Sequence, residues 1–240
     1  MTLTIVTAAY NEYPKIINLI NEWILFLSNS DFIENFEIIV VDDFSDESHF
    51  IPLKETFKDE YRVIVLRNDK NEGPGYSLNR AIQNSSYNWT IITDSDGQFP
   101  IQNLNNFKPY INDGLVNIIF THRNKKYDNI FNILGQKISN YICNKIYKTN
   151  LIDFSCAFKC VKSDILKRLK FDARYMNYSL DHTSKLLLTN GNFIDLPIIT
   201  KKAKSRKRGF AKELTRGVNR CLYIFYLFYF KILLHRRIIF

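Results

Sequence analysis

Two acidic residues, two positions apart and directly after an apolar run, form the segment of this sequence best suited to chemistry. Asp94 and Asp96 follow the apolar residues 89–93, and Gly97 supplies a turn that can direct both carboxylates to one small cation. Carboxylate oxygens are preferred ligands of Mg²⁺ and Mn²⁺. Because such a cation usually bridges to phosphates, the motif indicates a site for a nucleoside diphosphate. An ordinary Asp-rich turn is the alternative that these residues alone leave open.

A second acidic pair, Asp42 and Asp43, follows the apolar run 36–41. A carboxylate at this position can accept hydrogen bonds from a base or a ribose. Alternatively, Ser45 or Asp46 caps a helix that begins here, and both interpretations can hold together.

A third polar segment, Asn71 to Gly75, leads into a predicted helix that begins at about Tyr76. The backbone amides of this loop could face a phosphate, as amides at helix N-termini often do. A plain turn explains the same residues.

The elements that must position these residues alternate along the chain. Apolar runs separated by amphipathic stretches predict an α/β fold with a mostly parallel sheet and crossover helices. In such sheets ligands bind at the carboxyl ends of the strands, which is where the polar segments lie. The predicted strands are 3–8, 36–41, 63–66, 89–93 and 116–121, and the first helix spans about 14–27.

Composition excludes several classes of protein. A chain of 240 residues with 46% hydrophobic positions can bury a core, which excludes intrinsic disorder. Only 8 Gly and 6 Pro exclude a collagen-like chain. The four cysteines lack the paired spacing of a zinc knuckle, so we expect reduced thiols in a cytosolic protein. The first residues lack the features of a signal peptide.

The basic charge is concentrated at the C-terminus. Residues 201–240 hold twelve of the 33 Lys and Arg but one of the 24 acids, so this segment carries +11 and the rest of the chain −2. Within it, 221–234 is rich in aromatic residues and has Lys231 as its one charge. This run is short of the about 20 residues of a spanning helix, and it favours a helix at the lipid headgroup boundary. A core or oligomer-interface helix is the alternative, whereas segregated bases and aromatics disfavour nucleic-acid binding.

Seven segments, in order, resemble the family 2 glycosyltransferases. Within that family the resemblance is to dolichyl-phosphate mannose synthase-like enzymes and bacterial polyprenyl-phosphate sugar transferases. The most specific segment is 94–100, which has the form Asp-x-Asp-x-Gln-x-Pro. The resemblance covers about residues 2–212 and rests on 7–12, 41–46, 71–79, 94–100, 121–123, 153–159 and 206–212.

The resemblance implies a GT-A-type (Rossmann-like) domain over 1–204, with a nucleotide half at about 1–98 and an acceptor half at about 99–204. A basic, apolar, membrane-associating tail would then occupy 205–240. It also implies inverting transfer of one sugar from a UDP- or GDP-linked donor to a polyprenyl phosphate, with Mg²⁺ or Mn²⁺ stabilising the leaving nucleoside diphosphate. We expect the enzyme at the cytoplasmic face of the membrane as a peripheral protein, with a homo-oligomer as an option.

The residues that the resemblance assigns fall into four groups. The metal ligands would be Asp94, Asp96 and Gln98. The nucleotide would contact Tyr10, Glu12, Asp42, Asp43, Asn71, Gly73 and Asp94. The acceptor would contact Arg123, Lys159, Asp181, Arg206 and Lys212, since cations position a phosphate. Asp94, Asp96, Arg123 and Asp153 would be the catalytic residues.

The chain departs from the family pattern at several positions. Phe44 and Ala157 replace glycines, Ala211 replaces a serine, and residues 180–182 stand where an acidic residue often begins a late helix. One alternative function keeps the fold but transfers the sugar to a hydroxyl of a cell-surface glycan, with Asp153 or Asp181 as the base. A non-catalytic membrane-bound adaptor is the other.

Overall fold

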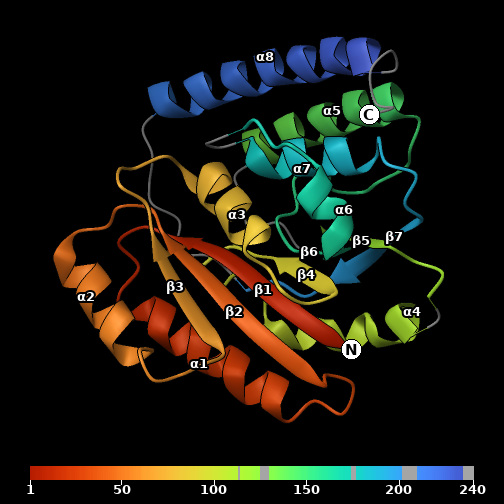
Figure 1. Cartoon of the computed structure of the whole chain (residues 1–240). Helices are drawn as coiled ribbons and strands as arrows, with labels where there is room; N and C mark the ends of the chain where they lie inside the picture. The colour runs from red at the N-terminus through yellow and green to blue at the C-terminus, as the bar shows by residue number, and fades with distance from the viewer. Residues whose placement is uncertain (113, 125–129, 174–176, 202–209, 235–240) are drawn as a thin grey trace.

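The protein is built around a seven-stranded sheet (Figure 1). The computed structural model describes all residues except 113, 125–129, 174–176, 202–209 and 235–240. The strand order is β3-β2-β1-β4-β6-β5-β7. The strands are β1 (Thr2–Ala9), β2 (Asn35–Asp42), β3 (Val63–Arg67), β4 (Trp89–Ile92), β5 (Ile118–Arg123), β6 (Lys159–Lys162) and β7 (Phe193–Ile198).

The mostly parallel sheet confirms the predicted fold class. Strands β1 to β4 pair in parallel, as do β5 and β7. The five predicted strands are all present, with ends within two residues of the prediction. The sequence analysis did not predict β6, which is four residues long and runs antiparallel to both β4 and β5. Because β6 places Lys159 opposite Ile92, the half predicted to bind the acceptor adjoins the end of β4.

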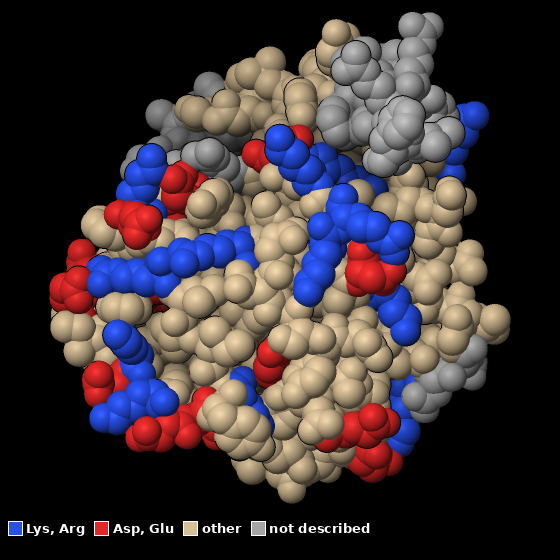
Figure 2. All heavy atoms as spheres, viewed as in Figure 1, with Lys and Arg blue, Asp and Glu red and all other residues tan. Residues whose placement is uncertain are grey.

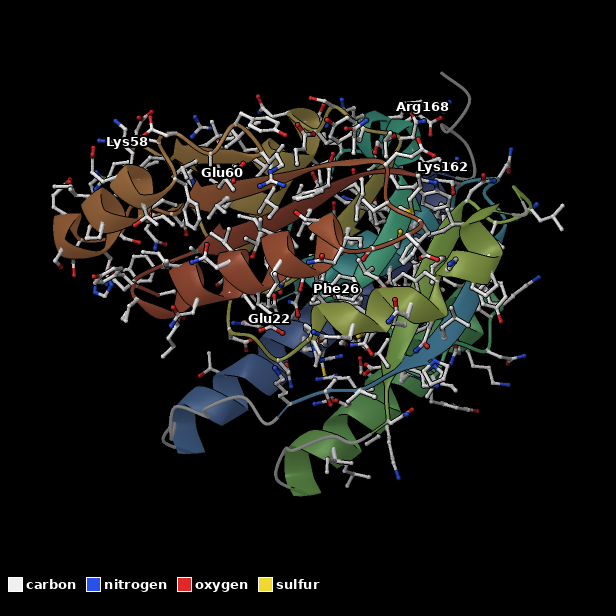
Figure 3. The ribbon with its side chains drawn as sticks, turned by 90° about the horizontal axis from the view of Figure 1, so that it is seen from below. Glu22, Phe26, Lys58, Glu60, Lys162 and Arg168 are labelled. Atoms are coloured by element: carbon white, nitrogen blue, oxygen red, sulfur yellow. The ribbon has the colours of Figure 1, made fainter. Side chains whose placement is uncertain are left out.

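Helices cover both faces of the sheet. One face carries α1 (Lys15–Ser28), α2 (Glu47–Thr56), the 3₁₀ helix η1 (Ile101–Asn106) and α4 (Lys108–Asn112). The other carries α3 (Pro74–Gln83), α5 (Ile130–Tyr147), α6 (Ser163–Arg168), α7 (Tyr178–Leu186) and α8 (Phe210–Leu234). Figure 3 views the first face from below, where Glu22 and Phe26 of α1 lie beside η1.

The side chains of β2, which point alternately to the two faces of the sheet, explain why helices cover both faces. Phe36, Ile38 and Val40 belong to the core under α1, whereas Ile39 and Val41 belong to the core under α3 and α5. Successive side chains of a strand point to opposite faces, so a strand buried on both sides needs an unbroken apolar run.

The C-terminal helix α8 packs along α5 (Figure 1). Ile224 and Leu227 are buried in the core on that side of the sheet. The opposite side of α8 exposes Leu222, Phe225 and Tyr229, and the atoms over α8 at the top of Figure 2 are mostly uncharged. In the part of the chain that the structure describes, no helix combines the length and apolar character needed to cross a bilayer.

Candidate active site

The loops that follow β1 and β2 are joined at the carboxyl edge of the sheet. The amide of Asn11 donates to Oγ of Ser45 at 2.9 Å, and the amide of Asp46 donates to Oδ1 of Asn11 at 3.0 Å. These contacts bring the predicted nucleotide residues Tyr10 and Glu12 beside the loop after Asp42. Tyr10 is half-exposed at this edge, and the Glu12 carboxylate lies 3.9 Å from Nζ of Lys15.

Phe44 adopts a backbone conformation that glycine prefers. Its φ is +64°, in the left-handed region, and its ring is half-exposed. Phe44, which replaces the glycine of the family pattern, therefore lies at a position where the backbone conformation favours glycine. The guanidinium carbon of Arg67 lies 5.5 Å from the centre of the Phe44 ring.

Asp42 is buried at the end of β2. Its Oδ2 accepts a hydrogen bond from the Ser45 amide at 3.0 Å and lies 3.5 Å from Nε of Arg67. The carboxylate thus shapes the turn that follows β2. Its contact with a nucleotide stays a prediction.

Asp43 organises the loop before α3. Its carboxylate accepts hydrogen bonds from Nδ2 of Asn68 at 2.8 Å and from Oγ of Ser77 at 3.1 Å. It also accepts the amides of Glu72 at 2.9 Å and Gly73 at 2.8 Å. Those two amides are consequently turned toward Asp43, which favours the plain turn over a loop whose amides face a phosphate. Nδ2 of Asn71 contacts the carbonyl oxygen of Asp43 at 3.3 Å, so the whole loop is fixed beside the site.

The predicted metal ligands lie on a tight turn after β4. Gly97 has a φ of +73°, and the Gln98 amide donates to Oδ1 of Asp96 at 2.9 Å. Asp96 is exposed, whereas Asp94 is partly buried. Burial and then the neighbouring charge of Asp96 raise the pKa of Asp94 to about 6.

These residues fit a divalent cation. Two carboxylates that repel each other, next to an amide side chain, are a donor set of hard oxygen ligands. Within the described residues no group of three or more His, Cys, Asp and Glu could hold a metal. A divalent cation bound by this acid pair would therefore take its other ligands from Gln98, water or phosphate oxygens, as is usual for Mg²⁺.

Tyr178, the first residue of α7, contacts Asp94 directly. Its hydroxyl donates a hydrogen bond to Oδ1 of Asp94. Burial and the charge of Asp94 raise the pKa of Tyr178 well above its usual value, so it stays protonated as a donor. The sequence analysis missed Tyr178, because nothing local to 177–180 distinguishes it from other tyrosines of the chain.

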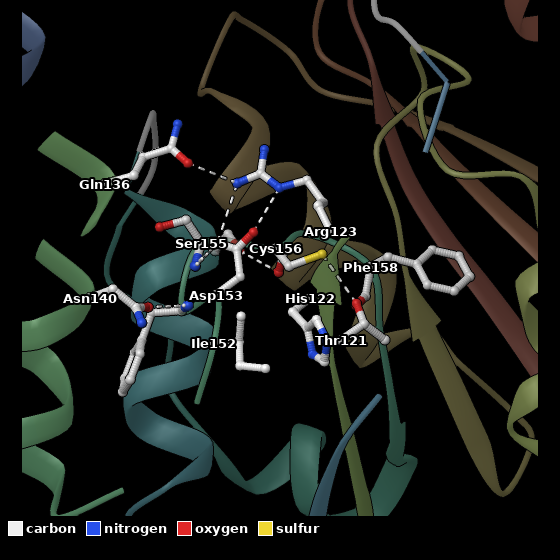
Figure 4. Close-up of polar contacts among 12 residues, drawn as sticks. Thr121, His122, Arg123, Gln136, Asn140, Ile152, Asp153, Ser155, Cys156 and Phe158 are labelled. Atoms are coloured by element: carbon white, nitrogen blue, oxygen red, sulfur yellow. Dashed lines mark hydrogen bonds and ion pairs between the residues drawn. The ribbon is translucent and has the colours of Figure 1, made fainter. Parts of the chain in front are cut away.

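Arg123 and Asp153 form a bidentate pair (Figure 4). Nε of Arg123 donates to Oδ2 of Asp153 at 2.7 Å, and Nη2 donates to Oδ1 at 3.3 Å. Nη2 also lies 3.3 Å from Oε1 of Gln136 on α5. Both carboxylate oxygens of Asp153 therefore face Arg123.

Lys159 lies beneath the site. It is 1% exposed, and its Nζ donates to the Cys156 carbonyl and to Oγ of Ser179 at 2.8 Å. Burial lowers the pKa of Lys159 to about 8. A direct contact with an acceptor phosphate stays a prediction, and its observed contacts are with the chain itself.

For Asp181 the structure corrects the expectation of an acceptor contact. The side chain is fully buried in α7, where Oδ1 lies 3.0 Å from Nζ of Lys185. Oδ2 accepts the amides of Asp172 at 2.7 Å and Ala173 at 3.1 Å. Asp181 therefore holds the segment before α7 in place. Arg206 and the side chain of Lys212, the other two predicted acceptor contacts, lie outside the described residues.

A pocket of about 100 Å³ lies between the metal ligands and the acceptor half. It brings Asp94, Gln98 and Arg123 together with residues that the sequence analysis did not assign. Those include Ser155, Tyr178 and Arg220, the last from α8. In the sequence, Arg220 is one of several basic residues of the segment 201–240. Only the packing of α8 against α5 distinguishes it from the others.

The comparisons with known proteins agree with this arrangement. The family model described as glycosyl transferase family 2 matches residues 4–171, which include the joined loops, Asp94, Asp96, Arg123 and Asp153. The chain belongs to glycosyl transferase family 2. This membership confirms the family that the motifs predicted and shows that the chain is a glycosyltransferase.

One curated relative and two solved structures of other proteins are similar to this glycosyltransferase. An uncharacterized glycosyltransferase of Haemophilus influenzae is 30% identical over 97 residues, which cover 40% of this chain and 30% of that protein. Glucosyl-3-phosphoglycerate synthase of Mycobacterium tuberculosis, in complex with UDP, has a TM-score of 0.70 at 13% identity, covering 95% of this chain and 80% of that one.

A third comparison is with a mannosyltransferase of Pyrobaculum calidifontis, in complex with GDP-Man and Mn²⁺. Its TM-score is 0.61 at 21% identity, over 88% of this chain and 59% of that one. The glycosyltransferase thus spans less than two thirds of this structure and of the Haemophilus relative. The GT-A fold is common to the enzyme and both solved structures.

Proposed function

We propose that this glycosyltransferase moves one sugar from a UDP- or GDP-linked donor to a polyprenyl phosphate. The observation that carries the proposal is the charge of the pocket beside Asp94. Two guanidinium groups line it, whereas Asp94 is its one carboxylate lining residue among those that the structure describes. A pocket with two cationic groups and one carboxylate favours an anionic acceptor.

The donor half depends on the acid pair of the turn after β4. Asp94, Asp96 and Gln98 would hold Mg²⁺ or Mn²⁺, which would stabilise the negative charge that develops on the departing nucleoside diphosphate. Support comes from the neighbours, because the mannosyltransferase structure contains GDP-Man and Mn²⁺ and the synthase was also solved with Mn²⁺ and UDP-glucose. Tyr178 orients Asp94, and Asp43 fixes the neighbouring loop.

The acceptor half favours a phosphate over a hydroxyl. A hydroxyl nucleophile needs a base within hydrogen-bond reach, whereas a phosphate monoester is already anionic near neutral pH. Both oxygens of Asp153 accept from Arg123, and Asp181 is buried against Lys185. Neither carboxylate is placed to take a proton from a sugar hydroxyl.

The exposed surface of two helices supports a membrane location for the acceptor. Leu222, Phe225 and Tyr229 recur on one side of α8, and Ile138 and Tyr141 are exposed on the adjoining α5. Aromatic and aliphatic groups beside a segment of net charge +11 suit the headgroup region of an anionic leaflet. We therefore place the enzyme, as a peripheral protein, at the cytoplasmic face of the membrane.

The test is mass spectrometry of reactions with a panel of UDP- and GDP-sugars, a short polyprenyl phosphate and Mn²⁺. We expect one hexose on the lipid phosphate, released by mild acid, as glycosyl phosphates are. Asp96→Ala should abolish transfer and leave the melting temperature almost unchanged, because Asp96 is exposed. Sugar attached stably to an oligosaccharide, with none on lipid phosphate, would reject the proposal.

A further inference from the structure

Arg220 of α8 connects three parts of the acceptor half. Its Nε donates to Oγ of Ser139 on α5 at 2.9 Å, and its Nη2 donates to Oγ of Ser155 in the loop before β6. Ser155 is held in turn, because its amide donates to Oδ1 of Asp153 at 3.2 Å. The guanidinium therefore reaches the pocket from a helix whose first residue, Phe210, follows Ser155 by 55 residues.

The partners of Arg220 are hydroxyl groups. Among the described residues no carboxylate lies within ion-pair distance of its guanidinium, although Arg220 is partly buried. The charge of Asp153 acts on Arg220, but both oxygens of this carboxylate already accept hydrogen bonds from Arg123. A partly desolvated cation without a paired anion costs free energy. An anionic ligand in the pocket would remove that cost.

The geometry of the guanidinium suits a phosphate. Arginine has five N–H donors, and two of those of Arg220 are used by described residues. The remaining donors belong to a side chain that lines the pocket together with Arg123. Two guanidiniums at one pocket can bind several oxygens of a single phosphate by charge-assisted hydrogen bonds.

We propose that Arg220 binds the phosphate of the acceptor, so that the C-terminal helix completes the active site. This inference rests on the proposed function for the identity of the acceptor. Apart from Asp94 and Gln98, the pocket residues come from the predicted acceptor half or, for Arg220, from the C-terminal helix, which places this phosphate apart from the donor loops after β1 and β2. Because α8 also exposes Leu222 and Phe225, one helix contacts the lipid surface and the lipid's phosphate.

The test compares two ligands on the full-length protein. Citronellyl phosphate represents the acceptor, and UDP or GDP with Mn²⁺ represents the donor; binding of each is measured by calorimetry. We expect Arg220→Gln to lower the affinity for citronellyl phosphate at least tenfold and to change the affinity for the nucleotide less than twofold. In turnover assays the acceptor KM should rise while the donor KM stays constant. Arg220→Lys should recover part of the acceptor affinity, because it restores the charge.

Two controls separate binding from a structural role. Ser139→Ala removes one contact of Arg220 but keeps the charge of Arg220, so it should lower the affinity for citronellyl phosphate much less than Arg220→Gln does. Lys137→Gln removes an exposed cation of α5 and should leave the affinities for both ligands unchanged. Melting temperatures of all variants establish that each is folded.

The outcomes distinguish this inference from the proposed function. Unchanged citronellyl phosphate affinity in Arg220→Gln would overturn the inference even if the wild type transfers sugar to lipid phosphate. Weakened nucleotide affinity instead would assign Arg220 to the donor and also overturn it. If the wild type binds citronellyl phosphate through Arg220 yet transfers sugar only to a glycan hydroxyl, the anion site stands and the proposed acceptor fails.

Discussion

The hydroxyl of Tyr178 donates a hydrogen bond to Oδ1 of Asp94, across 84 residues of sequence. This contact connects the start of α7 to the turn that carries the predicted metal ligands. It fixes the direction of one carboxylate and leaves its other oxygen for a cation. Tyr178, in the half predicted to bind the acceptor, therefore helps to position a predicted metal ligand.

Tyr178→Phe should weaken metal binding, because it removes the group that orients Asp94. Loss of an outer hydrogen-bond partner typically reduces metal affinity about 10- to 100-fold. We expect the Mn²⁺ concentration for half-maximal activity to rise in that range, with turnover largely restored at saturating Mn²⁺. Tyr229→Phe, on the exposed side of α8, is the matched control and should behave as the wild type. An unchanged Mn²⁺ requirement would show that the contact is dispensable.

Asp43→Asn should destabilise the protein through the loop before α3. The amides of Glu72 and Gly73 donate to different oxygens of the Asp43 carboxylate, and Asn replaces one of those oxygens by an NH₂ group, so at least one of the donors would lose its acceptor. Leaving such buried donors without an acceptor costs about 2–3 kcal/mol. Urea unfolding measures this loss. Asp46→Asn should cost less than about 1 kcal/mol, because Asp46 is exposed and an Asn carbonyl oxygen can also accept the hydrogen bond from Nδ2 of Asn11. Equal losses would contradict the special role of Asp43.

Two substitutions at Phe44 separate its ring from its backbone. Phe44→Ala and Phe44→Gly both remove the contact with Arg67, but glycine alone accepts a φ of +64° without a steric penalty. The left-handed conformation costs other residues about 1–2 kcal/mol, partly offset by the greater entropy of an unfolded glycine. We expect the free energy of unfolding of Phe44→Gly to be about 1 kcal/mol higher than that of Phe44→Ala. A less stable glycine variant would mean that the loop relaxes in the alanine variant.

Lys159 should make the stability of the protein depend on pH in the alkaline range. Burial lowers the pKa of Lys159 from 10.5 to about 8, so between these pH values the unfolded chain holds a proton that the folded chain has lost. Raising the pH in this window therefore favours the folded state. The unfavourable contribution of the buried ammonium is fully present below pH 8 and disappears as the pH approaches 10.5.

Urea unfolding of the wild type and Lys159→Met between pH 7.5 and 9.5 measures this effect. The free energy of unfolding of the wild type should rise relative to the variant by up to about 1.4 kcal/mol per pH unit above pH 8. Lys162→Met, at a partly exposed position of the same strand, is the control and should show no such slope. Parallel curves for the wild type and Lys159→Met would contradict the assignment.

The sequence by itself determined the local features of this protein. The apolar runs of β1 to β5 fixed the strands, and the motifs that follow them identified the family and the turn at Asp94, Asp96 and Gln98. These features depend on residues close in sequence, such as the Gln98 amide that donates to Asp96. For Asp43, which the motifs predicted as a nucleotide contact, the structure shows a carboxylate that holds the adjacent loop.

Only the tertiary structure decided which side chains face the pocket. Asp181 and Lys159 are charged residues in plausible motifs, yet packing buries both against other groups of the chain. Tyr178 and Arg220 reach the site through contacts between distant elements, which no local pattern of residue types encodes. The periodicity of α8 could indicate an amphipathic helix, but its position on α5, and hence the side on which Arg220 lies, follows from long-range packing.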